Sequence, residues 1–154
     1  MITIGSLFSG IGGLEIGLER GLAQADIHAT TLFQVEQNEY ARRVLAKHWP
    51  GALRFEDVRA VGADLPPVDL ICGGFPCQPF SKSGAQRGTL DETRGTLFFD
   101  ILRITEAKKP KFLILENVRN LAGPRHADTW ATIVRSLRGL GYRLADQPLV
   151  LSPH

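Results

Sequence analysis

Short apolar segments alternate with helix-like segments along the chain, and this alternation constrains the fold more than any other feature. Strands alternating with helices predict an α/β fold, with a mostly parallel sheet covered by helices on both faces. In such sheets ligands bind beyond the carboxyl ends of the strands, so the residues that follow each strand are the candidates for a site. The expected strands cover residues 2–8, 29–35, 53–55, 68–72 and 112–115.

The intervening segments carry the signals of helices. Gly21 is expected to end the first helix, and Pro50 to stop the second. In the second helix we expect Val44 and Leu45 to face inward. The region after the last helix is apolar enough to begin one or two more strands. The expected helices cover residues 14–22, 38–48, 96–108 and 128–140, and the additional strands residues 142–151.

The length of 154 residues fits one domain. The chain has two cysteines, Cys72 and Cys77, whose spacing fits no common zinc site, so no metal is expected. No apolar stretch approaches the roughly 20 residues of a membrane span. Free thiols without a signal peptide lead us to expect a cytoplasmic protein that does not bind membranes.

Charge is distributed unevenly along the chain. Residues 1–77 carry a net charge of −3, and residues 78–154 carry +5. A basic half is compatible with a polyanionic partner. A solvated surface explains the same charges, and charge alone does not decide between the two.

Cys77 lies in a turn of glycines and prolines that follows an apolar run. A thiol at the end of a strand can be partly exposed, and its thiolate is a nucleophile. The alternative is a small apolar residue in a turn. Cys72, inside the apolar run, is expected to be buried and inert. Residues 76–95 form the longest loop, and loops of this length are usually functional or disordered.

Three features after the first three strands fit a cofactor that contains adenosine. The glycine turn Phe8–Gly13 lets the backbone approach a ligand. Glu36, about 20 residues further on, is placed to accept the hydroxyls of a ribose. Asp57 can accept from an adenine amino group, and Val58 can cover the ring. The turn lacks the third glycine of a pyrophosphate-binding fingerprint, which favours S-adenosylmethionine over NAD.

Glu116 follows the strand over residues 112–115, and a carboxyl there can act as acid or base beside a thiol on a neighbouring strand. The alternative is that Glu116 caps a helix or pairs with Lys111 or Arg119.

Taken in order, these motifs resemble the DNA (cytosine-5)-methyltransferases, most closely those of bacterial restriction–modification systems. The resemblance covers nearly the whole chain. The segments that carry it are Phe8–Gly13, Glu36, Asp57, Gly74–Gln78, Arg94–Phe99 and Glu116–Val118.

The resemblance implies the Rossmann-like fold of S-adenosylmethionine-dependent methyltransferases. It implies that Cys77 adds to C6 of a flipped-out cytosine, that Glu116 holds N3 and the exocyclic amine, and that C5 takes the methyl group. Double-stranded DNA is then the substrate. The implied cofactor residues are Phe8, Gly10, Gly12, Gly13, Glu36, Gln37, Asp57, Val58, Pro76 and Leu97, and the implied substrate and loop residues are Gln78, Ser81, Lys82, Arg87 and Asn117.

Two departures from the family pattern stand out. Gln37 occupies a position where many relatives place an apolar or aromatic residue against the adenine. The chain also stops before the family's Gln-x-Arg-x-Arg motif, its target-recognition domain and its final Gly-Asn motif. Residues 1–154 are therefore expected to be the N-terminal part of a catalytic domain, incomplete at the C-terminus, and a C-terminal partner subunit could supply the rest.

We accordingly expect a DNA methyltransferase of the bacterial cytoplasm, associated with the nucleoid, present as a fragment or as one subunit of a split enzyme. Two alternatives stay open: an enzyme of this family that acts on transfer RNA, and a cofactor-binding or interaction module without catalytic activity. A nicotinamide-dependent oxidoreductase is disfavoured by the glycine pattern.

Overall fold

The computed structural model describes residues 1–76, 97–145 and 147–151. The chain divides into two compact units. The first comprises Met1–Phe75 and Leu97–Glu116, and the second comprises Pro76–Thr96 and Asn117–His154. The first unit contains all five strands expected from the sequence, together with most of the residues that directly follow them. These strands were expected at residues 2–8, 29–35, 53–55, 68–72 and 112–115.

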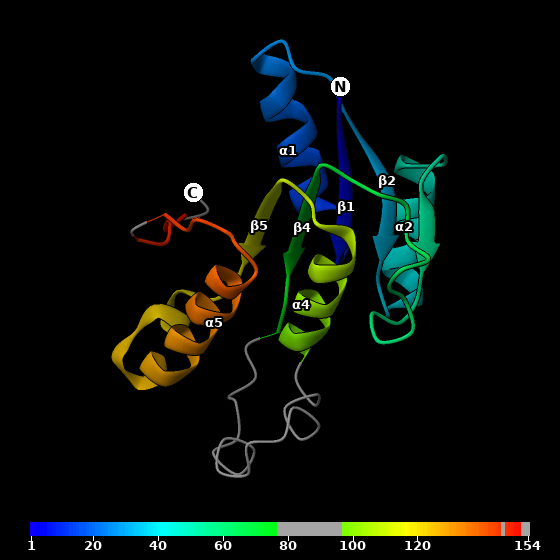
Figure 1. Ribbon diagram of the computed structural model, residues 1–154. Helices are drawn as coiled ribbons and strands as arrows, with labels where there is room; N and C mark the ends of the chain where they lie inside the picture. The colour runs from blue at the N-terminus through cyan, green and yellow to red at the C-terminus, as the bar shows by residue number, and fades with distance from the viewer. Residues whose placement is uncertain (77–96, 146, 152–154) are drawn as a thin grey trace. The chain divides into compact units, whose positions relative to one another are not determined.

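The first unit contains a five-stranded sheet with the order β3-β2-β1-β4-β5 (Figure 1). Every neighbouring pair is parallel, which confirms the predicted sheet and brings the carboxyl ends of all five strands to one edge. β4 is shifted toward its carboxyl end relative to the prediction and includes two glycines. The strands are β1 Ile2–Leu7, β2 Ala29–Val35, β3 Leu53–Phe55, β4 Leu70–Gly74 and β5 Phe112–Glu116.

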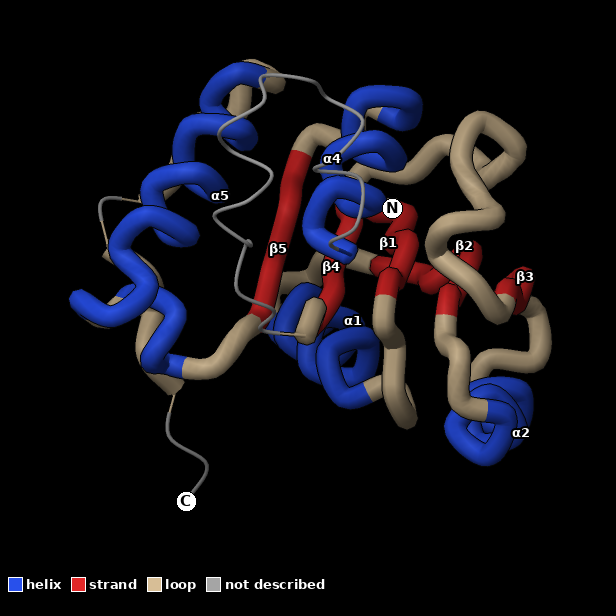
Figure 2. The backbone as a smooth tube through the Cα atoms, turned by 90° about the horizontal axis from the view of Figure 1, so that it is seen from below, coloured by secondary structure: helices blue, strands red, loops and turns tan. Residues whose placement is uncertain are grey.

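Helices cover both faces of this sheet, as predicted (Figure 2). α1 (Gly13–Gln24) and α2 (Glu39–His48) lie on one face, and α4 (Leu97–Lys108) lies on the other. Under α1, the buried strand residues Ile4 and Cys72 form a cluster against which Leu14 and Leu18 pack. The helical spacing of these leucines therefore marks the face of α1 that contacts the sheet.

The prediction that Gly21 ends the first helix was wrong, because α1 continues to Gln24. A glycine inside a helix costs about 1 kcal/mol relative to alanine but does not stop the helix. The ending is at Asp26, which adopts φ +58°. Its amide donates to the carbonyl of Ala23, and the next amide, of Ile27, donates to that of Leu22. This is the Schellman arrangement, with aspartate in the place that glycine usually takes.

α2 begins where the sequence predicts it. The side chain of Asn38 caps the helix by accepting from the Ala41 amide at 3.0 Å. Leu45 is fully buried, as expected, but Val44 is 37% exposed, so its expected inward orientation was wrong. Adjacent residues of a helix point about 100° apart, and a helix on a sheet surface buries only a narrow stripe.

In the second unit the structure describes Pro76 and residues 117–145 and 147–151. It contains the short 3-10 turns η2 (Arg119–Ala122) and η3 (Pro124–His126), followed by α5 (Ala127–Gly139). The expected strands at 142–151 are absent from the described residues of that range, so this prediction was wrong. A strand requires a neighbour that completes its hydrogen-bond ladder. The Tyr142 amide instead bonds to the Leu137 carbonyl at the end of α5.

Among the described residues, no helix has both the length and the apolar character needed to cross a membrane.

Candidate active site

The carboxyl edge of the sheet brings together the predicted site residues of the first unit. β1 lies at the centre, with β2 and β3 on one side and β4 and β5 on the other. The edge between β1 and β4 is therefore the topological switch point, where ligands bind in open α/β sheets. Glu36 and Asp57 follow the strands on one side, and Glu116 ends the outer strand on the other.

The glycine turn after β1 is built from left-handed backbone conformations. Phe8, Gly10 and Gly12 have φ values of +55°, +54° and +94°. A Cβ atom at Gly10 would meet no atom within 4 Å, whereas one at Gly12 would lie 2.4 Å from the ring of Trp49. Gly12 is thus needed for packing, while Gly10 borders open space that a ligand can enter, and the turn fits the predicted cofactor.

Glu36 connects the glycine turn with the next strand and helix. Its Oε2 atom accepts from the Gly10 amide at 2.8 Å, and its Oε1 atom accepts from the Asn38 amide at 2.7 Å. A carboxylate has about four lone-pair sites, so capacity remains for ligand hydroxyls. The sequence predicted a ribose-binding acid here, but did not reveal this internal role.

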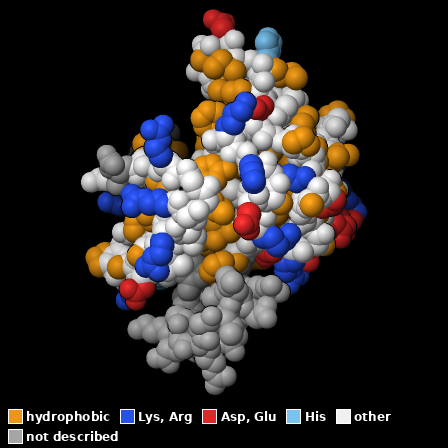
Figure 3. Space-filling model, in the orientation of Figure 1, with side chains coloured by type: hydrophobic (Ala, Val, Ile, Leu, Met, Phe, Trp, Pro, Cys, Tyr) orange, Lys and Arg blue, Asp and Glu red, His pale blue; other side chains and the backbone are white. Residues whose placement is uncertain are grey.

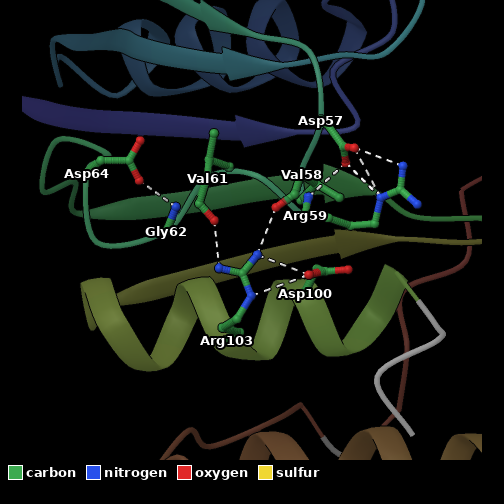
Figure 4. Close-up of polar contacts among 8 residues, drawn as sticks. All are labelled: Asp57, Val58, Arg59, Val61, Gly62, Asp64, Asp100 and Arg103. Carbon is green, nitrogen blue, oxygen red and sulfur yellow. Dashed lines mark hydrogen bonds and ion pairs between the residues drawn. The ribbon is translucent and has the colours of Figure 1, made fainter. Parts of the chain in front are cut away.

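Asp57 is engaged by a neighbour that the sequence reasoning did not identify. The Arg59 guanidinium bonds both oxygens of Asp57, with Nε to Oδ1 at 2.9 Å and Nη2 to Oδ2 at 2.8 Å (Figure 4). These side-chain bonds lower the pKa of Asp57 below its ordinary value. The carboxylate is thus a fixed acceptor. The side chain of the adjacent Val58 is 5% exposed, and its contact with an adenine ring stays a prediction. Gln37, the other residue expected near the adenine, is exposed.

Glu15 was missed by the sequence reasoning. It lies in the first turn of α1, directly after the glycine turn, and its side chain is completely buried. Its Oε1 atom accepts from Gln34 Nε2 at 3.4 Å. Among the described residues, neither Glu15 Oε2 nor Gln34 Oε1 has a hydrogen-bond partner. The sequence did contain a signal of this buried acid, because Glu15 directly follows Leu14, which lies on the apolar face of the helix.

The two glycines at the end of β4 have different roles. Gly74 pairs with Glu116 across β4 and β5. A Cβ atom at Gly74 would lie 2.9 Å from Glu116 Oε2, so the absence of a side chain leaves room for the carboxylate. At Gly73, a Cβ atom would lie 2.5 Å from the backbone oxygen of Leu7 in β1. Gly73 therefore allows β4 to pack against β1, and Gly74 leaves room for Glu116, the predicted catalytic acid.

The alternative pairing of Glu116 with Lys111 is not what the structure shows. Lys111 bonds Asp69 at 3.0 Å, at the opposite end of the strands from Glu116. Asp69 also accepts from the amide and the hydroxyl of Thr3. These bonds, that to the Thr3 amide foremost, lower the pKa of Asp69 to about 2.

The predicted nucleophile and its loop lie outside the described residues. Their flanks are described: Pro76 is exposed, Leu97 is partly buried, and the ring of Phe75 lies 5.5 Å from that of Phe98 in the first turn of α4. In the second unit, Asn117 Oδ1 accepts from the Val118 amide at 2.8 Å. The predicted site residues that lie outside the described ranges are Cys77, Gln78, Ser81, Lys82 and Arg87.

Cys72 is fully buried in β4, as expected. Burial, with a smaller contribution from Glu15, raises the pKa of its thiol to about 12. A thiol in this state is not a nucleophile at neutral pH.

Positive charge is in excess in the described part of the second unit, because acidic side chains are scarce there. In residues 117–145, Asp128 is the one acidic residue. Figure 3 shows Lys and Arg side chains gathered over the region of α5. Such a surface can make salt-sensitive contacts with phosphates. The exposed arginines are Arg119, Arg125, Arg135, Arg138 and Arg143. In the described parts of the chain, no three His, Cys, Asp or Glu side chains form a group that could hold a metal ion.

Comparison with known families gives a match over almost the whole chain. The family model of C-5 cytosine-specific DNA methylase matches residues 2–151. The type II methyltransferase M.AluI of Cellulosimicrobium cellulans is 45% identical over 96% of the chain and 28% of its own length. M.NlaX of Neisseria lactamica is 40% identical over 97% of the chain and 46% of its own length. The chain thus spans less than half the length of these relatives.

Solved structures show the same fold. DNMT2 of Spodoptera frugiperda superimposes with a TM-score of 0.62 at 21% identity, covering 91% of this chain and 41% of its own. Dnmt2 of S. pombe gives a TM-score of 0.59 at 21% identity, covering 87% of this chain and 40% of its own. The α/β fold with a mostly parallel sheet is therefore the fold of S-adenosylmethionine-dependent methyltransferases.

Proposed function

This chain belongs to the C-5 cytosine-specific DNA methylase family, and on that basis we propose that it forms part of an enzyme that methylates C5 of cytosine in double-stranded DNA. The methyl donor of this family is S-adenosylmethionine. The observation that carries the proposal is the row of acids along one sheet edge, Asp57, Glu36 and Glu116, with the glycine turn between the last two. We also propose a bacterial restriction–modification role in the cytoplasm, close to the nucleoid. The names of the relatives, type II methyltransferases, support the restriction–modification part of this proposal.

The cofactor half of the site uses Gly10, Glu36 and Asp57. Open space at Gly10 admits the ligand, the Glu36 carboxylate accepts from ribose hydroxyls, and Asp57 accepts from the adenine amino group. When bound, S-adenosylmethionine supplies a methyl group on a positively charged sulfur. Glu36 and Asp57 would hold the ribose and the adenine of the cofactor at the edge of the sheet that includes the β1–β4 switch point.

The catalytic half uses Cys77 and Glu116. The Cys77 thiolate forms a bond to C6 of a cytosine that has left the base stack, and electron density then accumulates at C5. Glu116 hydrogen-bonds the base at N3 and at its exocyclic amine. C5 takes the methyl group from the cofactor sulfur, which keeps the electron pair of the broken S–C bond and becomes a neutral thioether. A base then removes the C5 proton, and the bond to Cys77 breaks, which restores the aromatic ring and the free thiolate.

We further propose that residues 1–154 correspond to the N-terminal catalytic part of the enzyme. Support comes from the relatives, of which the chain spans 28% and 46%. Sequence recognition and the rest of the cofactor pocket would then come from residues beyond these, on the same polypeptide or on a partner subunit. Those residues would then recognise the DNA sequence by contacts with base edges in the major groove.

Covalent trapping tests the chemistry directly. DNA containing 5-fluorocytosine blocks the final elimination, so a productive complex with S-adenosylmethionine should become covalently joined to Cys77. The assay is run with the chain alone and with the C-terminal polypeptide of a relative supplied separately. Cys77→Ser should trap nothing, and Cys72→Ser should trap normally. Adducts that form through Cys72, or adducts that persist in Cys77→Ser, would refute the assignment.

A further inference from the structure

A cationic side chain of α4 holds the loop that carries Asp57. The loop spans residues 56–69, between β3 and β4. Arg103 donates from Nη2 to the Val58 carbonyl at 2.9 Å and from Nη1 to the Val61 carbonyl at 2.6 Å (Figure 4). Asp100, one turn earlier in α4, accepts from Arg103 at 3.0 Å and so orients the guanidinium. The planar, forked guanidinium is suited to fixing two acceptors at once.

The same helix makes a second contact with the far part of the loop. Lys108 donates to the Ala63 carbonyl at 2.7 Å. Between the two contacts lies Gly62, where a Cβ atom would be 2.8 Å from Arg103 Nη1. The Gly62 amide is taken by the side chain of Asp64 at 2.7 Å. Arg103 and Lys108 of one helix thus fix three loop carbonyls between them. Gly62, which has no side chain, leaves room for the Arg103 guanidinium.

Two effects hold this loop in place, and they act differently. The side chains of Val58, Val61 and Leu65 are at most 5% exposed, and their burial attaches the loop to the core. Burial is non-directional, so it does not fix the rotation of a peptide group. The hydrogen bond from Arg103 to Val58 is directional and acts on the residue next to Asp57. The carbonyl of Asp57 itself accepts from the Ala60 amide at 3.0 Å.

We propose that Arg103 is a positioning residue for the adenine end of the cofactor site. It fixes the Val58–Arg59 peptide, whose N–H donates to Asp57 Oδ1 at 2.9 Å. Arg103 thereby acts together with the Arg59 side chain on the direction in which the Asp57 carboxylate points. This inference rests on the proposed function, since it assigns Asp57 to the adenine amino group.

The test combines amide hydrogen exchange with calorimetric titration of S-adenosylmethionine on the full chain. Arg103→Gln removes the forked contact, and Arg103→Lys retains a charge that cannot serve both carbonyls. Lys108→Gln is the matched control, because it removes a contact from the same helix to the same loop at a greater distance from Asp57. Gly62→Ala displaces the guanidinium without changing its chemistry.

In Arg103→Gln we expect faster exchange at the Ala60 amide and about tenfold weaker cofactor binding, the effect of losing a hydrogen bond from a charged group. Arg103→Lys should recover part of both losses, and Gly62→Ala should reproduce a smaller version of them. Lys108→Gln should accelerate exchange at the Leu65 amide and leave the affinity within twofold of wild type.

The possible failures are distinguishable. If the wild-type chain does not bind S-adenosylmethionine even when the C-terminal polypeptide of a relative is supplied, the proposed function fails, and exchange at Ala60 alone decides whether Arg103 orients the loop. If the wild-type chain binds and Arg103→Gln binds equally well, the positioning role is overturned. It is overturned as well if Lys108→Gln weakens binding as much as Arg103→Gln, because the effect is then one of general loop stability.

Discussion

The carboxylate of Glu36 accepts a hydrogen bond from the amide of Gly10 at 2.8 Å, across 26 positions of the chain. The same carboxylate accepts from the Asn38 amide at the start of α2. One side chain therefore fixes the end of β1 against the end of β2 before any ligand binds. Such preorganisation reduces the ordering cost of binding.

Glu36→Gln should weaken both the fold and the cofactor site. Glutamine keeps one acceptor oxygen but directs an NH₂ donor at one of the two amides that Glu36 now satisfies. We expect the free energy of unfolding to fall by about 1–3 kcal/mol, and the affinity for S-adenosylmethionine to fall about tenfold or more. Urea denaturation and calorimetry measure the two effects.

Glu39→Gln is the control for this prediction. Glu39 pairs with Arg43 on the surface, where both side chains are more than 60% exposed, so its loss should change stability by less than about 1 kcal/mol. Unchanged affinity in Glu36→Gln, or tighter binding of NAD than of S-adenosylmethionine by the wild type, would contradict the assignment of the ribose acid.

Alanine substitutions at Gly73 and Gly74 should separate folding from chemistry. At Gly73 the new Cβ meets backbone of β1, which cannot move without disturbing the sheet, so we expect a loss of stability of about 1–3 kcal/mol or more. At Gly74 it meets the flexible end of Glu116, so the carboxylate is displaced while the fold survives.

The measurements are urea denaturation for both variants and covalent trapping of 5-fluorocytosine DNA for Gly74→Ala. Reduced trapping with a nearly unchanged unfolding midpoint is the expected result for Gly74→Ala. Trapping at the wild-type level would show that Glu116 does not need the space above Gly74.

Asp69 should make stability depend on pH in a defined acidic window. Its pKa in the folded state is about 2, below the ordinary value of 3.8, because it accepts from Thr3 and Lys111. The unfolded chain therefore binds this proton more readily. The stabilisation is fully present above about pH 4 and is lost as the pH falls through 2.

Urea midpoints between pH 2 and pH 6 test this window. Asp69→Asn should be less stable than wild type near pH 6 and should show a flatter profile between pH 4 and pH 2. Thr3→Val, which removes one of the donors, should give an intermediate slope. If wild type and Asp69→Asn have parallel profiles, Asp69 is not the titrating group.

Cys72 should be unreactive in the native protein. In Cys77→Ser it is the one remaining thiol, and its burial with a pKa of about 12 leaves almost no accessible thiolate at pH 8. Mass spectrometry after iodoacetamide treatment should find little modification of native Cys77→Ser and full modification in denaturant. Rapid labelling of the native variant would mean that β4 opens readily or is not buried.

The local elements could be predicted from the sequence, because their signals are local. Apolar runs and helical spacing located all five strands and the four described helices, and strand ends pointed to Glu36, Asp57 and Glu116. Alternation of strands and helices was enough for a parallel sheet, since parallel neighbours require crossover connections. The glycine turn was recognisable because few other residues adopt positive φ without strain.

Only the tertiary structure decided which groups meet. The end of α1 at Asp26 rather than Gly21 depends on hydrogen bonds that close the helix. Residues 142–145 and 147–151 contain no strand, because among the described residues no neighbouring strand completes a ladder with them. The bond between Glu36 and Gly10, like the contact of Arg103 with the loop of Asp57, joins segments far apart in the chain. Propensity acts over a few neighbouring residues, whereas buried polar groups take the partners that packing brings within hydrogen-bond distance.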